Sequence, residues 1–258
     1  MSILLQEEKD GVAVLTMNRP EAMNSLSSEL SLALQKAVKE IGGRRDIRAV
    51  IITGAGDRAF CAGADLKERR DLDAEGKWQQ RSRIWELNEM IWRMPQPVIA
   101  AIHGFCLGGG FEVALYCDLR VAADNAVFSF PEMTLGAYPG AGAAVVLPRL
   151  IGRGRAKEIF FTARKVKAGE ALSLGIVEWV VPRDQIVSKA FEVAYEIKKS
   201  SPLGIAGIKQ MVNFGADLTF EEANALNDKL RRPLEGTKDY LEGITAFFEK
   251  RPARYIGE

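Results

Sequence analysis

The chain has 258 residues, 47% of them hydrophobic and 27% charged, which is typical of one large globular domain with at most a small appendage. Its 35 basic and 34 acidic side chains give a net charge of +1, so nucleic acid or an anionic membrane is not expected as the main partner. Three cysteines and one histidine, His103, exclude a disulfide framework and the common Cys/His zinc patterns, and we expect no metal site.

The start of the chain and its hydropathy predict neither membrane insertion nor secretion. No apolar run approaches the ~20 residues that a membrane-spanning helix needs. The opening stretch, MSILLQEEKDG, becomes acidic too early for a signal peptide. We therefore expect a cytoplasmic protein, or a mature form that lacks a transit segment.

The first half of the chain alternates predicted strands and helices. A hairpin with the strands ILLQEE and GVAVLTMN is followed by an amphipathic helix, capped by Ser27 or Ser28 and stopped at Gly42 and Gly43. The apolar runs IRAVIITG and PVIAAIHG are typical of strands buried on both faces, and a polar helix over about 75–94 separates them. Two short strands, LRVAAD and AVFSF, come next. This alternation predicts an α/β fold with a mostly parallel sheet.

Beyond about Gly140 the chain is predicted to be almost entirely helical. One strand is expected at 175–181. Three helical segments, SPLGIAGIKQMVNFG, TFEEANALNDKLRRP and EGTKDYLEGITAFFEK, are separated by Gly, Pro and Thr. We therefore divide the chain into a core over residues 1–195 and a C-terminal helical region over 196–258. That region is expected to pack on the sheet or on a neighbouring subunit.

Two glycine-containing loops each follow a buried strand and precede a helix. They are FCAGADLKE, with Gly63 and Ala64, and CLGGGFE, with the glycines at 108–110. Ligands bind at the carboxyl ends of parallel strands, and helix N-termini offer free N–H groups there. One N–H from each loop would make an oxyanion hole. The alternative is that the glycines only let helices pack tightly on strands; a dinucleotide-binding fingerprint fits the spacing poorly.

Two glutamates are candidates for acid–base chemistry. Glu112 lies in the first turn of an apolar helix after the three glycines, and Glu132 follows Pro131 in a turn after a short strand. If the fold brings them together, one water can sit between them as one carboxyl holds a proton and the other stays charged. The alternative for each glutamate alone is a helix-capping or salt-bridged surface carboxylate.

Four stretches resemble the crotonase superfamily, the enoyl-CoA hydratases and isomerases, and specifically its hydratases. They are AFCAGADLKE, GFCLGGGFEVALYCD, FPEMTLGAYPGAG and EGITAFFEKRPARY, in the family's order over nearly the whole chain. The resemblance implies a spiral of ββα turns with a C-terminal helical region for trimerisation, as a homotrimer or a dimer of trimers. It also implies an acyl-CoA thioester as substrate, with no separate cofactor because coenzyme A is part of that substrate.

The resemblance also assigns roles to individual residues. The N–H groups of Ala64 and Gly109 would hold the thioester carbonyl oxygen. Glu132 would deliver a proton to C2, while Glu112 would activate the water that attacks C3 and Gly140 would help to orient that water. The residues implied in coenzyme binding are Ala62, Asp65, Leu66 and Lys67, together with Phe247 and Lys250 from a neighbouring subunit.

Retention of both glutamates favours hydration, because double-bond isomerases of the family often keep only the acid that corresponds to Glu132. The ending FFEKRPARYIGE is also similar to the methylglutaconyl-CoA hydratase branch. An arginine of the 75–94 helix could then bind a distal carboxylate, although solvated surface charges are the simpler interpretation. The run Ala143–Val146 departs from the family's pattern and leaves acyl preference open.

Two further hypotheses compete with an enzyme that hydrates enoyl-CoA. A nucleic-acid-binding role is suggested by relatives of the methylglutaconyl branch but disfavoured by the near-neutral charge. A non-catalytic scaffold subunit is disfavoured by the retention of both acids. We expect His103 to be a structural residue with satisfied hydrogen bonds, and Cys61 and Cys106 to be small apolar residues rather than nucleophiles.

Overall fold

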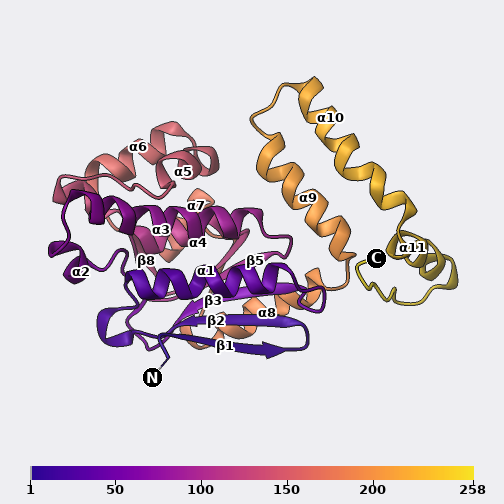
Figure 1. The fold of residues 1–258 in the computed structure, drawn as a ribbon, viewed down its shortest axis with the longest axis horizontal. Coiled ribbons are helices and arrows are strands. Elements are labelled where there is room, and N and C mark those ends of the chain that lie inside the picture. Colours follow the sequence, from indigo (N-terminus) through magenta and orange to yellow (C-terminus); the bar gives the residue numbers. More distant parts are fainter. Residues whose placement is uncertain (1) are drawn as a thin grey trace.

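The computed structural model describes residues 2–258, which form two sheets and eleven α-helices (Figure 1). The larger sheet has the strand order β1-β2-β3-β5-β7-β10, and the smaller one has the order β4-β6-β8-β9. The strands are β1 (Leu4–Lys9), β2 (Val12–Met17), β3 (Ala49–Gly54), β4 (Ala59–Cys61), β5 (Val98–Ile102), β6 (Phe105–Leu107), β7 (Leu119–Ala123), β8 (Val127–Ser129), β9 (Val166–Lys167) and β10 (Trp179–Val181).

Helices cover both faces of the larger sheet and make up most of the C-terminal half. The α-helices are α1 (Ser28–Gly42), α2 (Leu66–Arg70), α3 (Ala74–Arg93), α4 (Gly109–Tyr116), α5 (Ala143–Ile151), α6 (Arg153–Thr162), α7 (Ala168–Leu174), α8 (Ile186–Ile197), α9 (Pro202–Gly215), α10 (Phe220–Arg231) and α11 (Lys238–Glu249). The 3-10 helices are η1 (Pro20–Ala22), η2 (Pro131–Leu135), η3 (Arg183–Gln185) and η4 (Arg232–Gly236). Over residues 2–258 no helix is long and apolar enough to cross a membrane.

The core is a repeated ββα turn, as the resemblance implied. The units are β3–β4–α2, β5–β6–α4 and β7–β8 followed by η2 and α5. In each unit the first strand joins the larger sheet and the second joins the smaller one. Because β3, β5 and β7 pair in parallel, and β4, β6 and β8 do as well, equivalent loops emerge at one edge of the small sheet. The loops before α2 and α4 are therefore brought together.

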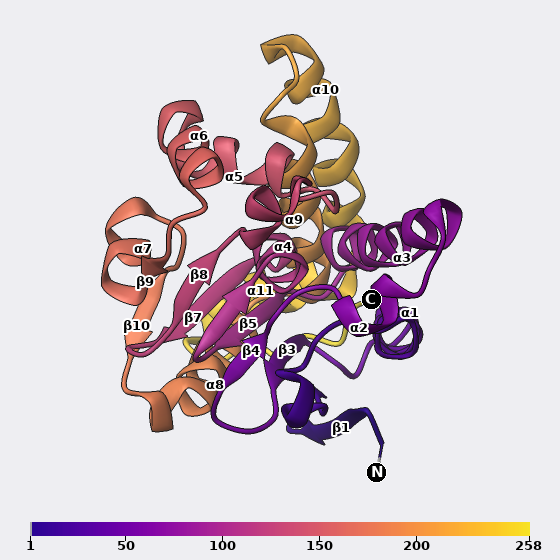
Figure 2. The same ribbon diagram turned by 90° about the vertical axis from the view of Figure 1, so that its left-hand side faces the viewer.

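Alternating side chains of the larger sheet enter two separate cores. The helices that lie on its two faces can be followed in Figure 2. Val50 and Ile52 of β3 pack on the side covered by α1, α3 and α4, whereas Ala49 and Ile51 pack on the side covered by α8. The strand is buried at every position, which explains why its sequence is continuously apolar rather than alternating.

Most of the expected elements are present with small shifts at their ends. Ser27 caps α1 by accepting a hydrogen bond from the Leu30 N–H, which decides between the two candidate caps. The strand expected at 175–181 is shortened to β10, because Gly175 adopts φ +78° and ends α7 instead of extending a strand. The two-residue strand β9 was not expected, since so short a pairing leaves no hydrophobic pattern. The three-residue strands β4 and β6 overlap the two segments predicted as loops, so part of each loop is a strand instead.

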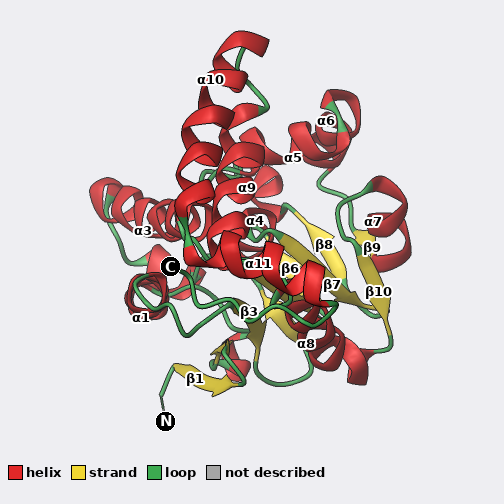
Figure 3. Cartoon of the chain, turned by 90° about the vertical axis from the view of Figure 1, so that its right-hand side faces the viewer, coloured by secondary structure: helices red, strands yellow, loops and turns green. Residues whose placement is uncertain are grey.

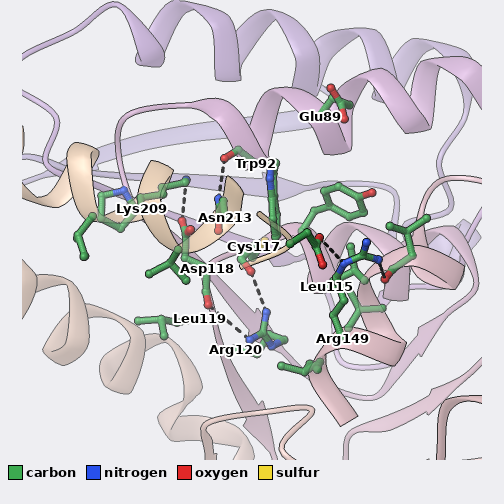
Figure 4. A pocket seen from close by; sticks show the side chains of 18 of the residues that line it. Glu89, Trp92, Leu115, Cys117, Asp118, Leu119, Arg120, Arg149, Lys209 and Asn213 are labelled. Atoms are coloured by element: carbon green, nitrogen blue, oxygen red, sulfur yellow. Dashed lines mark hydrogen bonds and ion pairs between the residues drawn. The ribbon is translucent and has the colours of Figure 1, made fainter. Parts of the chain in front are cut away.

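The C-terminal helices extend away from the sheets, and α9 pairs with α10 (Figures 1 and 3). The middle of α9 is anchored by Lys209, whose buried ammonium group donates to the carbonyls of Ile91 and Gln96 and pairs with Asp118 at 2.7 Å. This anchor lines a mostly apolar cavity of about 640 Å³ between α3, α4, α5 and α9 (Figure 4). Trimerisation through this region stays a prediction.

His103, at the end of β5, differs from its expected state. Its side chain is fully buried, but neither ring nitrogen has a hydrogen-bond partner of normal geometry among residues 2–258. Burial, and then the charge of Arg183, lower the pKa of His103 to about 4. All three cysteines are buried free thiols, and burial raises the pKa of Cys61 to about 12, which disfavours a nucleophilic role.

The buried histidine predicts a loss of stability in mild acid. Between pH 6.5 and 4 the unfolded chain binds a proton at His103 that the folded chain does not, so the free energy of unfolding falls as the pH falls. We expect wild type to lose about 2 kcal/mol more than His103→Gln between pH 7.5 and 4.5 in urea denaturation. Equal losses in the two proteins would contradict this account of the histidine.

Candidate active site

A cavity of about 310 Å³ opens where the first two ββα units meet η2 and α3. The loop after β4 and the start of α4 form one wall, and η2 and the segment before α5 form another. Its lining residues are Ala62, Gly63, Ala64, Leu66, Arg69, Arg81, Ile84, Gly108, Gly109, Glu112, Pro131, Glu132, Leu135, Ala137, Tyr138, Gly140 and Ala141. The two glycine-containing loops and both candidate acids therefore share one cavity.

The backbone N–H groups of Ala64 and Gly109 lie next to each other. A Cβ atom added to Gly63 would lie 3.2 Å from the nitrogen of Gly109, and one added to Gly109 would lie 3.4 Å from the nitrogen of Ala64. Gly109 is the first residue of α4, where N–H groups have no partner within the helix. In the described part of the chain neither N–H donates to a protein acceptor. The pair is therefore available to a carbonyl oxygen in the cavity.

Glu112 is held by one of its two carboxylate oxygens. Its side chain is 3% exposed, and Oε1 accepts hydrogen bonds from the N–H groups of Ala141 at 2.7 Å and Ala143 at 3.1 Å. Burial raises the pKa of Glu112 to about 7, and the charge of Glu132 adds to the increase. The carboxyl group is thus fixed in direction and poised to exchange a proton near neutral pH. It is not a surface salt bridge, although the bond from Ala143 also satisfies the first N–H of α5.

Glu132 approaches the same space from η2. Its Oε2 atom is buried and has no hydrogen-bond partner among residues 2–258. A Cβ atom added to Gly108 would lie 2.3 Å from Oε1, so the carboxyl group lies directly against the glycine before α4. Burial raises the pKa of Glu132. A buried, unpaired carboxyl is costly, and such groups are characteristic of catalytic sites.

Comparison with known proteins identifies the family to which the chain belongs. The family described as enoyl-CoA hydratase/isomerase matches residues 7–258. The chain belongs to the enoyl-CoA hydratase/isomerase family. It is accordingly a hydratase enzyme of the crotonase fold that acts on acyl-CoA thioesters.

Individual relatives match nearly end to end. The short-chain-enoyl-CoA hydratase of Clostridium acetobutylicum is 39% identical over 250 residues, covering 95% of this chain and 94% of that protein. The mitochondrial methylglutaconyl-CoA hydratase of Rattus norvegicus is 39% identical over 258 residues, covering 98% of this chain and 82% of that protein. The crystal structure of an enoyl-CoA hydratase from Bacillus anthracis superposes with a TM-score of 0.97 at 41% identity, covering all of both chains.

The residues expected to bind coenzyme A in this family member fall into two groups. Ala62 and Leu66 line the catalytic cavity, whereas the Asp65 side chain caps α2 and pairs with Arg19 at 2.9 Å. Lys67 is exposed in the first turn of α2. The Asp65 carboxylate is therefore occupied by the protein itself, and its role toward the coenzyme stays a prediction for the backbone alone.

Phe247 and Lys250 lie on α11 or at its end, exposed and outside the catalytic cavity. In Figure 1 α11 lies on the opposite side of the molecule from α2. Within one chain these residues do not complete the hydratase site. Their predicted contact with the coenzyme therefore requires a neighbouring subunit.

The arginines of α3 have different surroundings, which sequence analysis did not resolve. Arg83 donates to the Ser28 hydroxyl and Arg93 pairs with Glu89, but Arg81 enters the catalytic cavity. Its Nε donates to the Gly140 carbonyl at 2.5 Å. The spacing of charged residues along α3 contains no signal for this difference, because the 140–143 segment is distant in the sequence.

No cluster of His, Cys, Asp or Glu within residues 2–258 could hold a metal ion.

Proposed function

We propose that this enzyme adds water across the 2,3 double bond of a trans-2-enoyl-CoA to give a 3-hydroxyacyl-CoA. The observation that carries the proposal is the convergence of Glu112 and Glu132 on one cavity beside two free backbone N–H groups. An oxyanion hole, a base and an acid are the parts that hydration of an enoyl thioester requires.

The geometry supports different roles for the two carboxyl groups, one as a base and the other as an acid. The N–H groups of Ala64 and Gly109 stabilise the enolate oxygen that develops as the double bond is attacked. Glu112, anchored through Oε1, accepts a proton from the water that attacks C3, and protonated Glu132 supplies a proton to C2. Both carboxyl groups line the same cavity, so in this mechanism the water oxygen and the proton are delivered to the same face of the double bond and the addition is syn.

Two acyl groups are candidates, and each has an observation in its favour. The relative from Clostridium acetobutylicum is named for short-chain substrates. The relative from Rattus norvegicus is named for methylglutaconyl-CoA, whose acyl group ends in a carboxylate. Arg81 favours this second class, since it lines the cavity and neither of its Nη atoms has a hydrogen bond to residues 2–258. Isomerisation of a double bond is a weaker alternative because both acids are retained.

Turnover of crotonyl-CoA and 3-methylglutaconyl-CoA, followed by loss of the conjugated enoyl absorbance, tests the proposal. Hydration of at least one substrate is expected, and activity on neither would contradict it. If Arg81 binds the distal carboxylate, Arg81→Met should lower the kcat/KM ratio of methylglutaconyl-CoA to crotonyl-CoA at least tenfold, since a charge-assisted pair is lost. An unchanged ratio would remove the carboxylated class.

The assembly and location of the enzyme belong to the same proposal. A trimer would bring Phe247 and Lys250 of one subunit to the coenzyme of another, and the large exposed side chains of α9–α11 supply apolar area for such contacts. A cytoplasmic location, and the lack of a nucleic-acid partner, stay predictions from composition.

A further inference from the structure

Four hydrogen bonds hold the segment that connects η2 to α5 between α3 and Glu112. From α3, Arg81 Nε donates to the Gly140 carbonyl at 2.5 Å, and Asn88 Nδ2 donates to the Ala141 carbonyl at 2.8 Å. From the other side, Glu112 Oε1 accepts from the N–H groups of Ala141 and Ala143. Arg81 and Asn88 are seven residues apart, so they lie two turns apart on the same face of the helix.

A single peptide group in this segment forms hydrogen bonds with both Arg81 and Glu112. The Gly140 carbonyl and the Ala141 N–H belong to the same peptide group, which accepts from Arg81 and donates to Glu112. A cation bound to the carbonyl polarises the amide and strengthens the hydrogen bond that its N–H donates. The guanidinium is itself held in place over the rings of Trp78 at 4.8 Å and Trp85 at 5.5 Å.

We propose that Arg81 is a positioning residue for Glu112 and acts through the Gly140–Ala141 peptide, with Asn88 fixing the neighbouring peptide. This inference rests on the proposed hydration by Glu112. It assigns Arg81 a role that does not depend on the acyl group, in addition to any recognition of a distal carboxylate. Asn88 is fully buried on α3, and it supports the segment without carrying charge.

Among the charged and titratable groups around Glu112, Arg81 is the cation that is linked to it through a single peptide group. Glu132 approaches from η2, and Tyr116 lies on the same helix as Glu112, α4. Burial, and then the charges of Glu89 and Glu112, raise the pKa of Tyr116. Arg69 of α2 also lines the cavity, but its guanidinium donates to the Lys77 carbonyl and the Gln80 side chain. The start of α5 contributes only backbone N–H groups to Glu112. The Arg81 charge lowers the pKa of Glu112, opposing the effect of burial.

The test is the pH dependence of kcat/KM with crotonyl-CoA, which has no distal carboxylate. In Arg81→Met the ascending limb should move upward by about one pH unit, and kcat at pH 7 should fall about tenfold, because charged Glu112 has lost its support. Arg81→Lys keeps the cation and one donor and should restore most of the limb. Arg83→Met removes a neighbouring cation of α3 that has no contact with the 140–143 segment, and its limb should match wild type.

Asn88→Ala removes a hydrogen bond to the 140–143 segment without removing a charge, so it separates the effect of positioning Glu112 from the effect of charge on its pKa. It should lower kcat about tenfold with little change in KM while the ascending limb stays in place, since no charge is removed. If Arg81→Met loses activity with an unmoved limb, Arg81 is only structural and the inference is overturned. Full activity of Arg81→Met on crotonyl-CoA would also overturn it. Failure of the hydration mechanism itself is distinguished by Glu112→Gln, which should be inactive if that mechanism holds.

Discussion

Replacing Glu132 with Gln is expected to lower kcat for crotonyl-CoA at least a hundredfold, and replacing Glu112 with Gln should have an effect of the same order. The amide keeps the size of each side chain but can neither give up nor accept the proton, and acid–base groups contribute about 10²–10⁴ in rate. Steady-state kinetics with matched circular dichroism spectra provide the measurement. The losses should be far from additive in the double variant, because both groups act on one water.

The same variants should retain or gain stability. Both carboxyl groups are buried with raised pKa values, so ionisation of either group in the folded chain opposes folding. A neutral amide removes that cost, and we expect thermal unfolding temperatures at or above that of wild type. An active Glu112→Gln, Glu132→Gln double variant would show that the assigned acids do not carry the reaction.

Replacing Gly108 with Ala is expected to leave a folded protein with about a hundredfold less activity. The new Cβ would lie 2.3 Å from Oε1 of Glu132, and the flexible end of that side chain must shift by about 1 Å to relieve the contact. A displacement of that size at a reacting group typically costs about 10²-fold in rate. The positive φ of +48° adds backbone strain of roughly 1–3 kcal/mol, which lowers the unfolding temperature without abolishing the fold.

Gly136→Ala provides the control for backbone strain. Gly136 ends η2 with φ +76°, and a Cβ there meets nothing within 4 Å. This variant should lose about 1 kcal/mol of stability and keep its turnover. If both alanine variants lose activity equally, strain in the loop rather than contact with Glu132 is responsible.

The sequence was informative wherever its signal is local. A cap at Ser27 or Ser28, the buried strand over 49–54 and the helix starts after the glycine loops depend on neighbouring residues, and all are present, with Ser27 as the cap. The predictions missed the shortest strands, β4, β6 and β9, and the lack of hydrogen-bond partners for the His103 side chain. These features depend on contacts with residues distant in the sequence.

In the candidate site, too, local features could be predicted from the sequence and long-range contacts could not. Glu112 and Glu132 could be named as acids from their motifs, but their meeting depends on how successive ββα units stack. The contact of Arg81 with Gly140 spans 59 residues of sequence, and nothing in the pattern of α3 separates Arg81 from Arg83. Resemblance to a family supplied the roles, while the path of the chain supplied the contacts.

The dependence of this site on main-chain N–H groups affects how it tolerates mutation. Ala64, Gly109, Ala141 and Ala143 contribute amides rather than side chains, and any residue that keeps the same backbone path offers the same donor. An alanine scan leaves Ala64, Ala141 and Ala143 unchanged because they are already alanine, and Gly109→Ala would place a Cβ 3.4 Å from the nitrogen of Ala64, within the donor pair itself. Replacement of a single amide by an ester, as semisynthesis allows, would remove the donor alone. In the proposed mechanism the backbone N–H groups stabilise the negative charge of the reaction. The side chains around the cavity can therefore change, and with them the acyl group that the enzyme accepts, without loss of these donors.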